Sequence, residues 1–141
     1  MNSLFKGDIA EKKFELMCIE NNIEIFKPVN SGNMVDYIIN VNGVLKRIQV
    51  KYITPRNNRI DVALFKTSHN TLEKDIRYYT LSNTDLFLIY SDNIWYSIPL
   101  PSPSNPIKQV CLRTCLPKNN QRKNVNFASD FIFDIKNWCS H

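Results

Sequence analysis

Residues 35–51 have the sequence VDYIINVNGVLKRIQVK, and this stretch decides the fold. At its centre is Asn42-Gly43, a dipeptide that favours the two-residue turn of a β-hairpin because both residues tolerate a positive φ angle. The residues on either side are rich in Val and Ile, which are typical of strands. We therefore predict two antiparallel strands, 35–41 and 44–53, joined by this turn.

Polar side chains interrupt the apolar pattern near the open end of this hairpin. Strand residues alternate between the two faces of a sheet, so Gln49 and Lys51 point to one side while Ile48 and Val50 point to the other. Asp36 lies near the start of the first strand, which the hairpin brings beside the end of the second. The sequence therefore predicts that Asp36, Gln49 and Lys51 converge at one point of the sheet.

The three predicted neighbours suit the hydrolysis of phosphodiester bonds with a divalent metal ion. The carboxylate of Asp36 and the amide oxygen of Gln49 are ligands of the kind that Mg²⁺ prefers, and the main-chain carbonyl of Val50 could supply a further one. Such an ion polarises a phosphate and lowers the pKa of a bound water, and Lys51 could hold that water or stabilise charge on the phosphate. Each residue taken singly is more often part of a solvated strand face, so only the joint pattern points to catalysis.

Before the hairpin, apolar residues at helical spacing predict a helix over residues 4–20. Ser3 can cap the start of this helix, and Asn21-Asn22 would end it. Other apolar runs predict short strands at 23–28, 60–66, 85–90, 94–98 and 110–116. The run 85–90 is typical of a strand that is covered on both faces.

Three segments have a less regular pattern. Residues 71–79 are expected to form a short helix or an irregular bridge. Four of the seven prolines lie between Pro99 and Pro106, which predicts an extended connector. Residues 124–138 carry apolar side chains at helical spacing and are expected to form a closing helix.

Composition describes an ordinary globular chain of 141 residues, with 43% hydrophobic and 22% charged residues. That length predicts one domain, 1–141, with a core of its own. No apolar run approaches a membrane span and the first residues lack an apolar signal core, so a cytoplasmic protein is expected. The net charge of +5 modestly favours polyanion partners.

The four cysteines form no C-x-x-C pair, which favours reduced thiols over a zinc site.

The order of these residues resembles the PD-(D/E)XK nuclease superfamily. The likeness rests on the acid of Lys6–Glu11 in the first helix, on Val35-Asp36 and on Gln49-Val50-Lys51. More narrowly, the chain is similar to the group I intron-encoded homing endonucleases of this fold, the cyanobacterial type. Later segments carry the same likeness, at 85–90, 95–99, 112–113 and 118–121. In this group a Gln is expected at position 49, where most of the superfamily has Asp or Glu.

The resemblance implies an α/β fold with a mixed sheet: a restriction-endonuclease-like core in which an N-terminal helix is followed by a mixed β-sheet flanked by helices. It also implies a site-specific endonuclease that cuts double-stranded DNA and serves intron homing. Glu11, Asp36, Gln49 and Lys51 would be the catalytic residues, with Mg²⁺, or Mn²⁺ in its place, held by Glu11, Asp36, Gln49 and the Val50 carbonyl. The resemblance further implies a homodimer or homotetramer, in which two-fold symmetry supplies two active centres.

Three polar segments are candidates for contact with DNA, because long polar side chains can contact base edges or phosphates. They lie just before Asp36, in the loop after the catalytic strand, and in a basic run near the C-terminus. The candidate residues are Ser31, Asn33, Arg56, Asn57, Asn58, Arg59, Lys118, Asn119, Gln121, Arg122 and Lys123.

Two alternatives remain open at this point. A structure-specific nuclease such as a Holliday junction resolvase has a similar arrangement of a helical acid, an Asp and a Lys. A catalytically silent DNA-binding module of the same fold is the second alternative, and the neutral Gln49 gives it weight.

Overall fold

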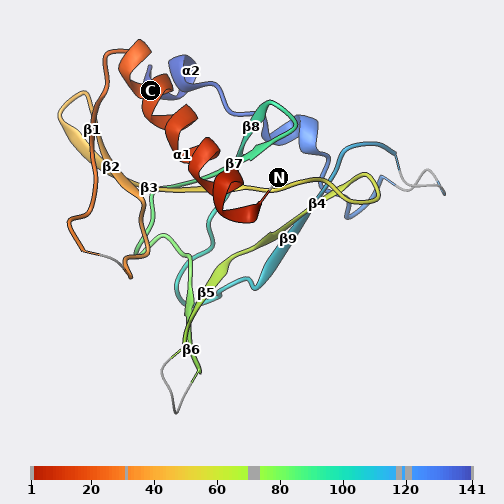
Figure 1. Ribbon diagram of the computed structural model, residues 1–141. Coiled ribbons are helices and arrows are strands. Elements are labelled where there is room, and N and C mark those ends of the chain that lie inside the picture. The colour runs from red at the N-terminus through yellow and green to blue at the C-terminus, as the bar shows by residue number, and fades with distance from the viewer. Residues whose placement is uncertain (1, 31, 70–73, 117–118, 120–121, 141) are drawn as a thin grey trace.

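The computed structural model describes residues 2–30, 32–69, 74–116, 119 and 122–140. The chain begins with helix α1 (Ser3–Glu20), which packs across the front of a five-stranded sheet (Figure 1). Asn2, rather than the expected Ser3, caps α1: its side chain accepts a hydrogen bond from Leu4 N at 2.9 Å while Ser3 is already helical. The helix ends where expected, because Asn22 adopts a positive φ of 57° that cannot continue it. No helix in these described ranges is long and apolar enough to cross a membrane.

The main sheet has the strand order β1-β2-β3-β7-β8. Its members are β1 (Glu24–Phe26), β2 (Tyr37–Val41), β3 (Val44–Tyr52), β7 (Leu86–Ser91) and β8 (Ile94–Ile98). Strands β3 and β7 pair in parallel and all the other neighbours pair antiparallel, so the sheet is mixed as expected. The predicted turn has φ of 53° at Asn42 and 88° at Gly43, the left-handed values that a tight hairpin requires.

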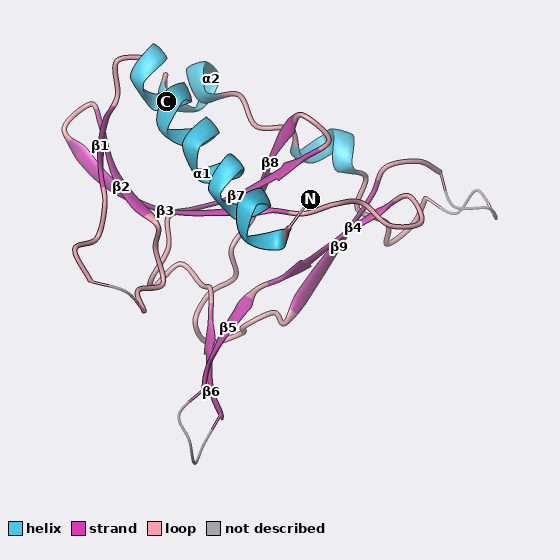
Figure 2. Cartoon of the chain, in the orientation of Figure 1, coloured by secondary structure: helices cyan, strands magenta, loops and turns pink. Residues whose placement is uncertain are grey.

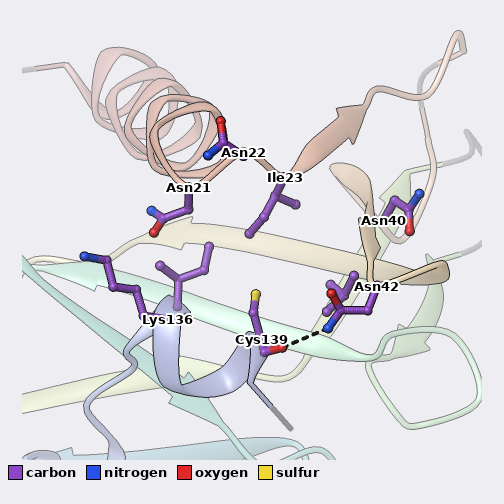
Figure 3. Close-up of a pocket in the computed structure, with 9 residues that line it drawn as sticks. Asn21, Asn22, Ile23, Asn40, Asn42, Lys136 and Cys139 are labelled. Atoms are coloured by element: carbon purple, nitrogen blue, oxygen red, sulfur yellow. Dashed lines mark hydrogen bonds between the residues drawn. The ribbon is translucent and has the colours of Figure 1, made fainter.

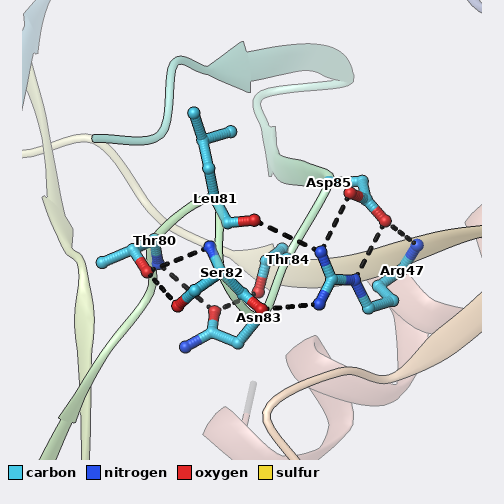
Figure 4. Close-up of polar contacts among 7 residues, drawn as sticks. All are labelled: Arg47, Thr80, Leu81, Ser82, Asn83, Thr84 and Asp85. Carbon is cyan, nitrogen blue, oxygen red and sulfur yellow. Dashed lines mark hydrogen bonds and ion pairs between the residues drawn. The ribbon is translucent and has the colours of Figure 1, made fainter. Parts of the chain in front are cut away.

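A partly exposed ion pair fixes the strand pairing between β3 and β7. The guanidinium of Arg47 donates to both carboxylate oxygens of Asp85, at 3.0 and 3.1 Å, and also to the carbonyls of Ser82 and Leu81 (Figure 4). Arg47 N donates to the same carboxylate at 2.8 Å. A parallel pair has no turn to set its register, and these bonds hold the residue before β7 against the middle of β3.

Four further strands form two ribbons outside the main sheet. Strand β4 (Arg59–Ala63) pairs with β9 (Gln109–Arg113), and β5 (Phe65–His69) pairs with β6 (Lys74–Tyr78). The expected strand 60–66 is thus divided at Leu64, a fully buried residue whose N–H and C=O bond to Lys108 and Tyr79 instead of to a ladder. The expectation of a helix or irregular bridge at 71–79 was wrong for its described part, since β6 pairs with β5 as a strand.

The main sheet is covered on both faces, as the apolar run in β7 predicts; all six residues of β7 are buried. One core cluster packs α1 against alternate residues of the sheet such as Ile48, Val50 and Leu88. The other cluster packs the opposite face, including Phe87 and Ile89, against the β4–β9 ribbon. Both α-helices lie on one side of the sheet (Figure 2), and the β4–β9 ribbon covers the other side.

The C-terminal segment departs from the single closing helix expected over 124–138. It forms a short 3-10 helix (Ala128–Phe131) and then α2 (Ile135–Cys139). Ile132 forms an extended bridge to Tyr96, and Phe133 N donates to Trp95 O at 2.8 Å, so pairing with β8 interrupts the helix. Asp134 then caps α2 by accepting from Lys136 N.

A cavity at the far end of α1 separates it from α2 and the β2–β3 turn (Figure 3). Asn42 Nδ2 donates to Cys139 O across it at 3.0 Å, which fastens α2 to the hairpin. All four cysteines are free thiols.

Candidate active site

Helix α1 brings Glu11 to the edge of the sheet. Ala10 and Phe14 are fully buried against the sheet, so Glu11, next to Ala10, lies half-buried at the border of the contact. Tyr37 OH donates to Glu15 Oε2 at 2.6 Å and to Glu11 O at 3.3 Å. This tyrosine follows Asp36 directly in the chain, so its two bonds fix the helical acid relative to Asp36.

Asp36 lies where β2 and β3 separate. Pairing starts at Tyr37 opposite Ile48, and Asp36 N still donates to Ile48 O at 2.9 Å. One step further along β3, the Val50 N–H has no β2 carbonyl to meet; it donates to Asp36 Oδ2 at 3.0 Å instead. The carboxylate is thus anchored through one oxygen by a main-chain donor, and its orientation does not depend on a flexible partner.

Gln49 and Lys51 lie on the face of β3 opposite to Ile48 and Val50, as strand alternation predicts. Lys51 Nζ donates to Ala63 O at 3.4 Å and lies 5.5 Å from the ring centroid of Tyr79 and 5.7 Å from that of Phe87. Gln49 is buried, with 7% of its surface exposed, and its Nε2 donates to Val50 O at 3.3 Å. The amide nitrogen, not the amide oxygen, therefore lies next to the carbonyl that was expected to bind metal.

The pKa values show that Asp36, Glu11 and Lys51 interact. Burial raises the pKa of Asp36, while the Val50 N–H and the ammonium groups of Lys66, Lys51 and Lys27 oppose that rise. Burial and the neighbouring charge of Asp36 raise the pKa of Glu11. Burial also lowers the pKa of Lys51, against the attraction of Asp36. The protein thus holds two acids and a lysine in an environment that disfavours their charged forms, and a bound cation would relieve the two acids.

An open cavity joins Glu11 and Asp36 to two lysines that the sequence analysis did not select. Its lining residues are Glu11, Lys27, Pro28, Asn30, Gly32, Asn33, Val35, Asp36 and Lys66. Lys27 forms an ion pair with Glu15 at 3.4 Å and lies over the ring of Tyr37. Lys66 belongs to β5, and a single lysine in a predicted strand gives no sign of what the strand faces; only the docking of the β5–β6 hairpin reveals it.

The predicted DNA-contact loop after β3 lies beside the end of β9, the strand that precedes the basic run. Arg56 and Arg59 flank a tight turn with positive φ at Asn57 and Asn58, and all four residues are exposed. Arg59 is paired with Arg113 across the β4–β9 ribbon, and Thr114 N donates to Asn58 O. The turn therefore lies beside Arg113 and Thr114, which precede the basic run, although more than fifty residues separate them from the turn in the sequence.

The remaining predicted contacts are less uniform. Asn119, Arg122 and Lys123 are exposed, whereas Ser31, Lys118 and Gln121 lie outside the described residues. The amide of Asn33 donates to Asn30 O at 2.6 Å, so this side chain closes its own loop.

Within the described ranges no three His, Cys, Asp or Glu side chains gather as a metal-binding group. The donor set near Asp36 is instead two carboxylates, an amide and a main-chain carbonyl. The carboxylates and the main-chain carbonyl are hard oxygen donors, and the amide can present its oxygen. Such a set of donors fits a cation such as Mg²⁺ rather than a metal bound by thiolate or imidazole.

The comparisons with known proteins agree with this geometry. A family model described as PD-(D/E)XK endonuclease matches residues 1–134, and the chain belongs to this family. The chain also has the fold of a solved bacterial homing endonuclease, I-Ssp6803I, with a TM-score of 0.70 and 18% sequence identity over 98% of this chain and 91% of that one. No curated protein matches the sequence. The family places the chain among nucleases that act on nucleic acid with divalent metal ions.

Proposed function

We propose that this chain is a site-specific endonuclease that cuts both strands of DNA, acting as one nuclease domain over its 141 residues. The observation that carries the proposal is the placement of Asp36. Its carboxylate is anchored by the Val50 N–H where β2 and β3 separate, within electrostatic reach of both Glu11 and Lys51. The structural likeness to a homing endonuclease supports the site-specific form of the activity.

Asp36 and Glu11 would hold the divalent ion, because their two negative charges balance its two positive ones. Their raised pKa values support this assignment, since both acids gain most from a cation between them. Gln49 and the Val50 carbonyl would supply neutral oxygens, and for this the Gln49 amide must turn over to present Oε1 in place of Nε2. Mg²⁺, with Mn²⁺ as a substitute, would polarise the scissile phosphate and lower the pKa of an attacking water.

Lys51 would donate hydrogen bonds to the phosphate as negative charge develops on its oxygens. Among the residues that the structure describes, its ammonium has one long hydrogen bond, to Ala63 O, and lies near two aromatic rings, so it can turn to a phosphate. A cation placed beforehand in a partly dry site stabilises such charge more strongly than one in water.

The test is cleavage of a randomised duplex library in Mg²⁺, with the products sequenced. We expect recurrent cuts at one long sequence, and Lys51→Ala should abolish cutting but leave binding intact. Lys136→Ala, which removes a charge from α2, is the matched control and should cut normally. Preferential cutting of four-way junctions would favour a resolvase, and no cutting in Mg²⁺ or Mn²⁺ would favour a silent DNA-binding module.

Cutting both strands at one site is simplest for a symmetric assembly, and we include a homodimer or homotetramer in the proposal. Light scattering of the protein with and without a cleaved target duplex measures the subunit number. A monomer in both states would refute this part.

A further inference from the structure

The β5–β6 hairpin projects from the body of the protein, away from α2 (Figure 1). Near its base, Lys66 of β5 is paired directly with Arg77 of β6. Like charges at directly opposite positions of two antiparallel strands destabilise the pair. A hairpin that keeps two cations there needs a source of negative charge or another compensation.

Both cations point to the same short segment, the end of the loop that leads to Asp36. Lys66 Nζ donates to Asn33 O at 3.1 Å, and Arg77 Nη2 donates to Gly32 O at 3.1 Å. Carbonyl oxygens are neutral, so these bonds orient the cations without neutralising them. The ion pairs among the residues described here include neither cation.

One donor of this pair is left over. Arg77 Nε is buried and has no hydrogen-bond partner among the described atoms. Buried polar groups without a partner are rare in folded proteins, and each one points to strain, an ordered water or a bound ligand. The ammonium of Lys66 also carries three donors, which exceeds the single bond to Asn33 O.

The location of the pair suggests which anion it would bind. Lys66 lines the same cavity as Glu11 and Asp36, and its charge acts on both Asp36 and Lys51. An anion at Lys66 and Arg77 would therefore lie next to the proposed cutting site, separated from the acids by the lysine. A phosphate oxygen suits the fork of an arginine and the point charge of a lysine.

We propose that Lys66 and Arg77 form a clamp for a backbone phosphate of the DNA, adjacent to the phosphate that is cut. The clamp rests on the proposed function for its ligand but uses none of the proposed catalytic residues. By binding a neighbouring phosphate, it would fix the position of the strand relative to Asp36 and also offset the repulsion between the two cations.

The experiment compares the unmutated protein with Lys66→Gln, Arg77→Gln and the double variant in binding to duplex DNA without divalent metal, over a range of salt concentrations. Each single variant should lose about tenfold in affinity, the effect of one charge-assisted hydrogen bond. The slope of log K against log salt should fall by about 0.9, the value for one phosphate contact. Because both side chains bind one phosphate, the double variant should lose little more than the single ones.

Lys136→Gln is the control, because it removes the same charge from α2 at the opposite end of the molecule; its slope should not change. Lys66→Arg keeps the charge and should keep the slope. If the pair only braces the loop at Gly32 and Asn33, the Gln variants will lower the melting temperature and leave the slope unchanged, which would overturn the clamp.

The outcomes separate the clamp from the proposed function. Binding that depends on the clamp, in a protein that never cuts, would refute the nuclease and uphold the clamp. Cutting by the double variant with unchanged affinity and slope would refute the clamp and uphold the nuclease. A protein that binds no duplex DNA at all would overturn both.

Discussion

Replacing Lys51 with Met should make the protein more stable and at the same time inactive. Lys51 is a half-buried ammonium whose pKa is lowered, mainly by burial, so the folded state disfavours its charge. Met has a similar length and makes favourable contacts with aromatic rings such as Tyr79 and Phe87. The residue that costs stability is the one proposed to act on the phosphate, a trade-off that is common at active sites.

The magnitude follows from the contacts that are lost and gained. Met gives up a long hydrogen bond to Ala63 O and two cation–π contacts at 5.5 and 5.7 Å, each of roughly 0.5–1 kcal/mol. It removes the desolvation of the ammonium, and each pKa unit of the lowering corresponds to about 1.4 kcal/mol. Met also buries apolar surface in place of the ammonium. We expect a net gain of about 1 kcal/mol in the free energy of unfolding at neutral pH.

The pH dependence gives the sign of the effect independently. The pKa of Lys51 in the folded protein lies below its ordinary value of 10.5, so between these two values the unfolded chain binds more protons. Stability of the unmutated protein therefore gains from this group as pH rises through that window. The advantage of Lys51→Met should be full at neutral pH and should vanish near pH 10.5.

Urea unfolding at several pH values measures both effects, and Lys46→Met on the same strand is the control, with a change within about 0.5 kcal/mol. A Lys51→Met protein less stable than the unmutated one at neutral pH would refute the argument that burial dominates. So would an advantage that persists unchanged at high pH.

Three other changes test separate parts of the structure. Asp85→Asn should lower the free energy of unfolding by about 1–2 kcal/mol at neutral pH, measured by urea unfolding. This is less than the sum of the hydrogen bonds to Arg47, because both side chains are about a third exposed. The Arg47 guanidinium lowers the pKa of Asp85, so this cost should disappear as pH falls through that lowered pKa; a cost that persists in acid would show that charge is not its source. Gly43→Ala should lower the free energy of unfolding by about 1 kcal/mol through its φ of 88° alone, because a Cβ there meets no atom within 4 Å; Gly7→Ala on α1 should not. Gln49→Glu should cost about 2 kcal/mol by burying a third acid, while lowering the Mg²⁺ concentration for half-maximal cleavage; an unchanged Mg²⁺ dependence would argue against Gln49 as a ligand.

The hairpin at 35–53 and the strand at 85–90 could be predicted because their signals are local. The turn residues Asn42-Gly43 set the register, and an uninterrupted apolar run specifies burial on both faces. The C-terminal segment could not be predicted in the same way. Its apolar spacing favours a helix, but pairing of Ile132 and Phe133 with β8 overrides that preference, and such long-range bonds leave no local signal.

The candidate site also has a part that local sequence signals predict and a part that depends on long-range pairing. Asp36 and Lys51 follow from strand alternation and the hairpin, and the structure places them within electrostatic reach of each other. Their roles, and those of Glu11 and Gln49, stay predictions. Arg77 lies in a segment that was expected to be a short helix or an irregular bridge. The residues that approach Asp36 from that side, Lys66 and Arg77, could therefore not be selected before the β5–β6 pairing was known.

The charges around Asp36 give a reason for a neutral residue at position 49. Glu11 and Asp36 already have raised pKa values, so a third acid, buried at position 49, would be protonated or would require a second cation. With Gln49, two carboxylates match one divalent ion, and the lysines remain for the phosphates. A site with Gln49 is therefore suited to one metal ion, and lysines supply the remaining positive charge that binds the phosphates. In such a site, removing Lys66 should weaken substrate binding even where the metal affinity rises.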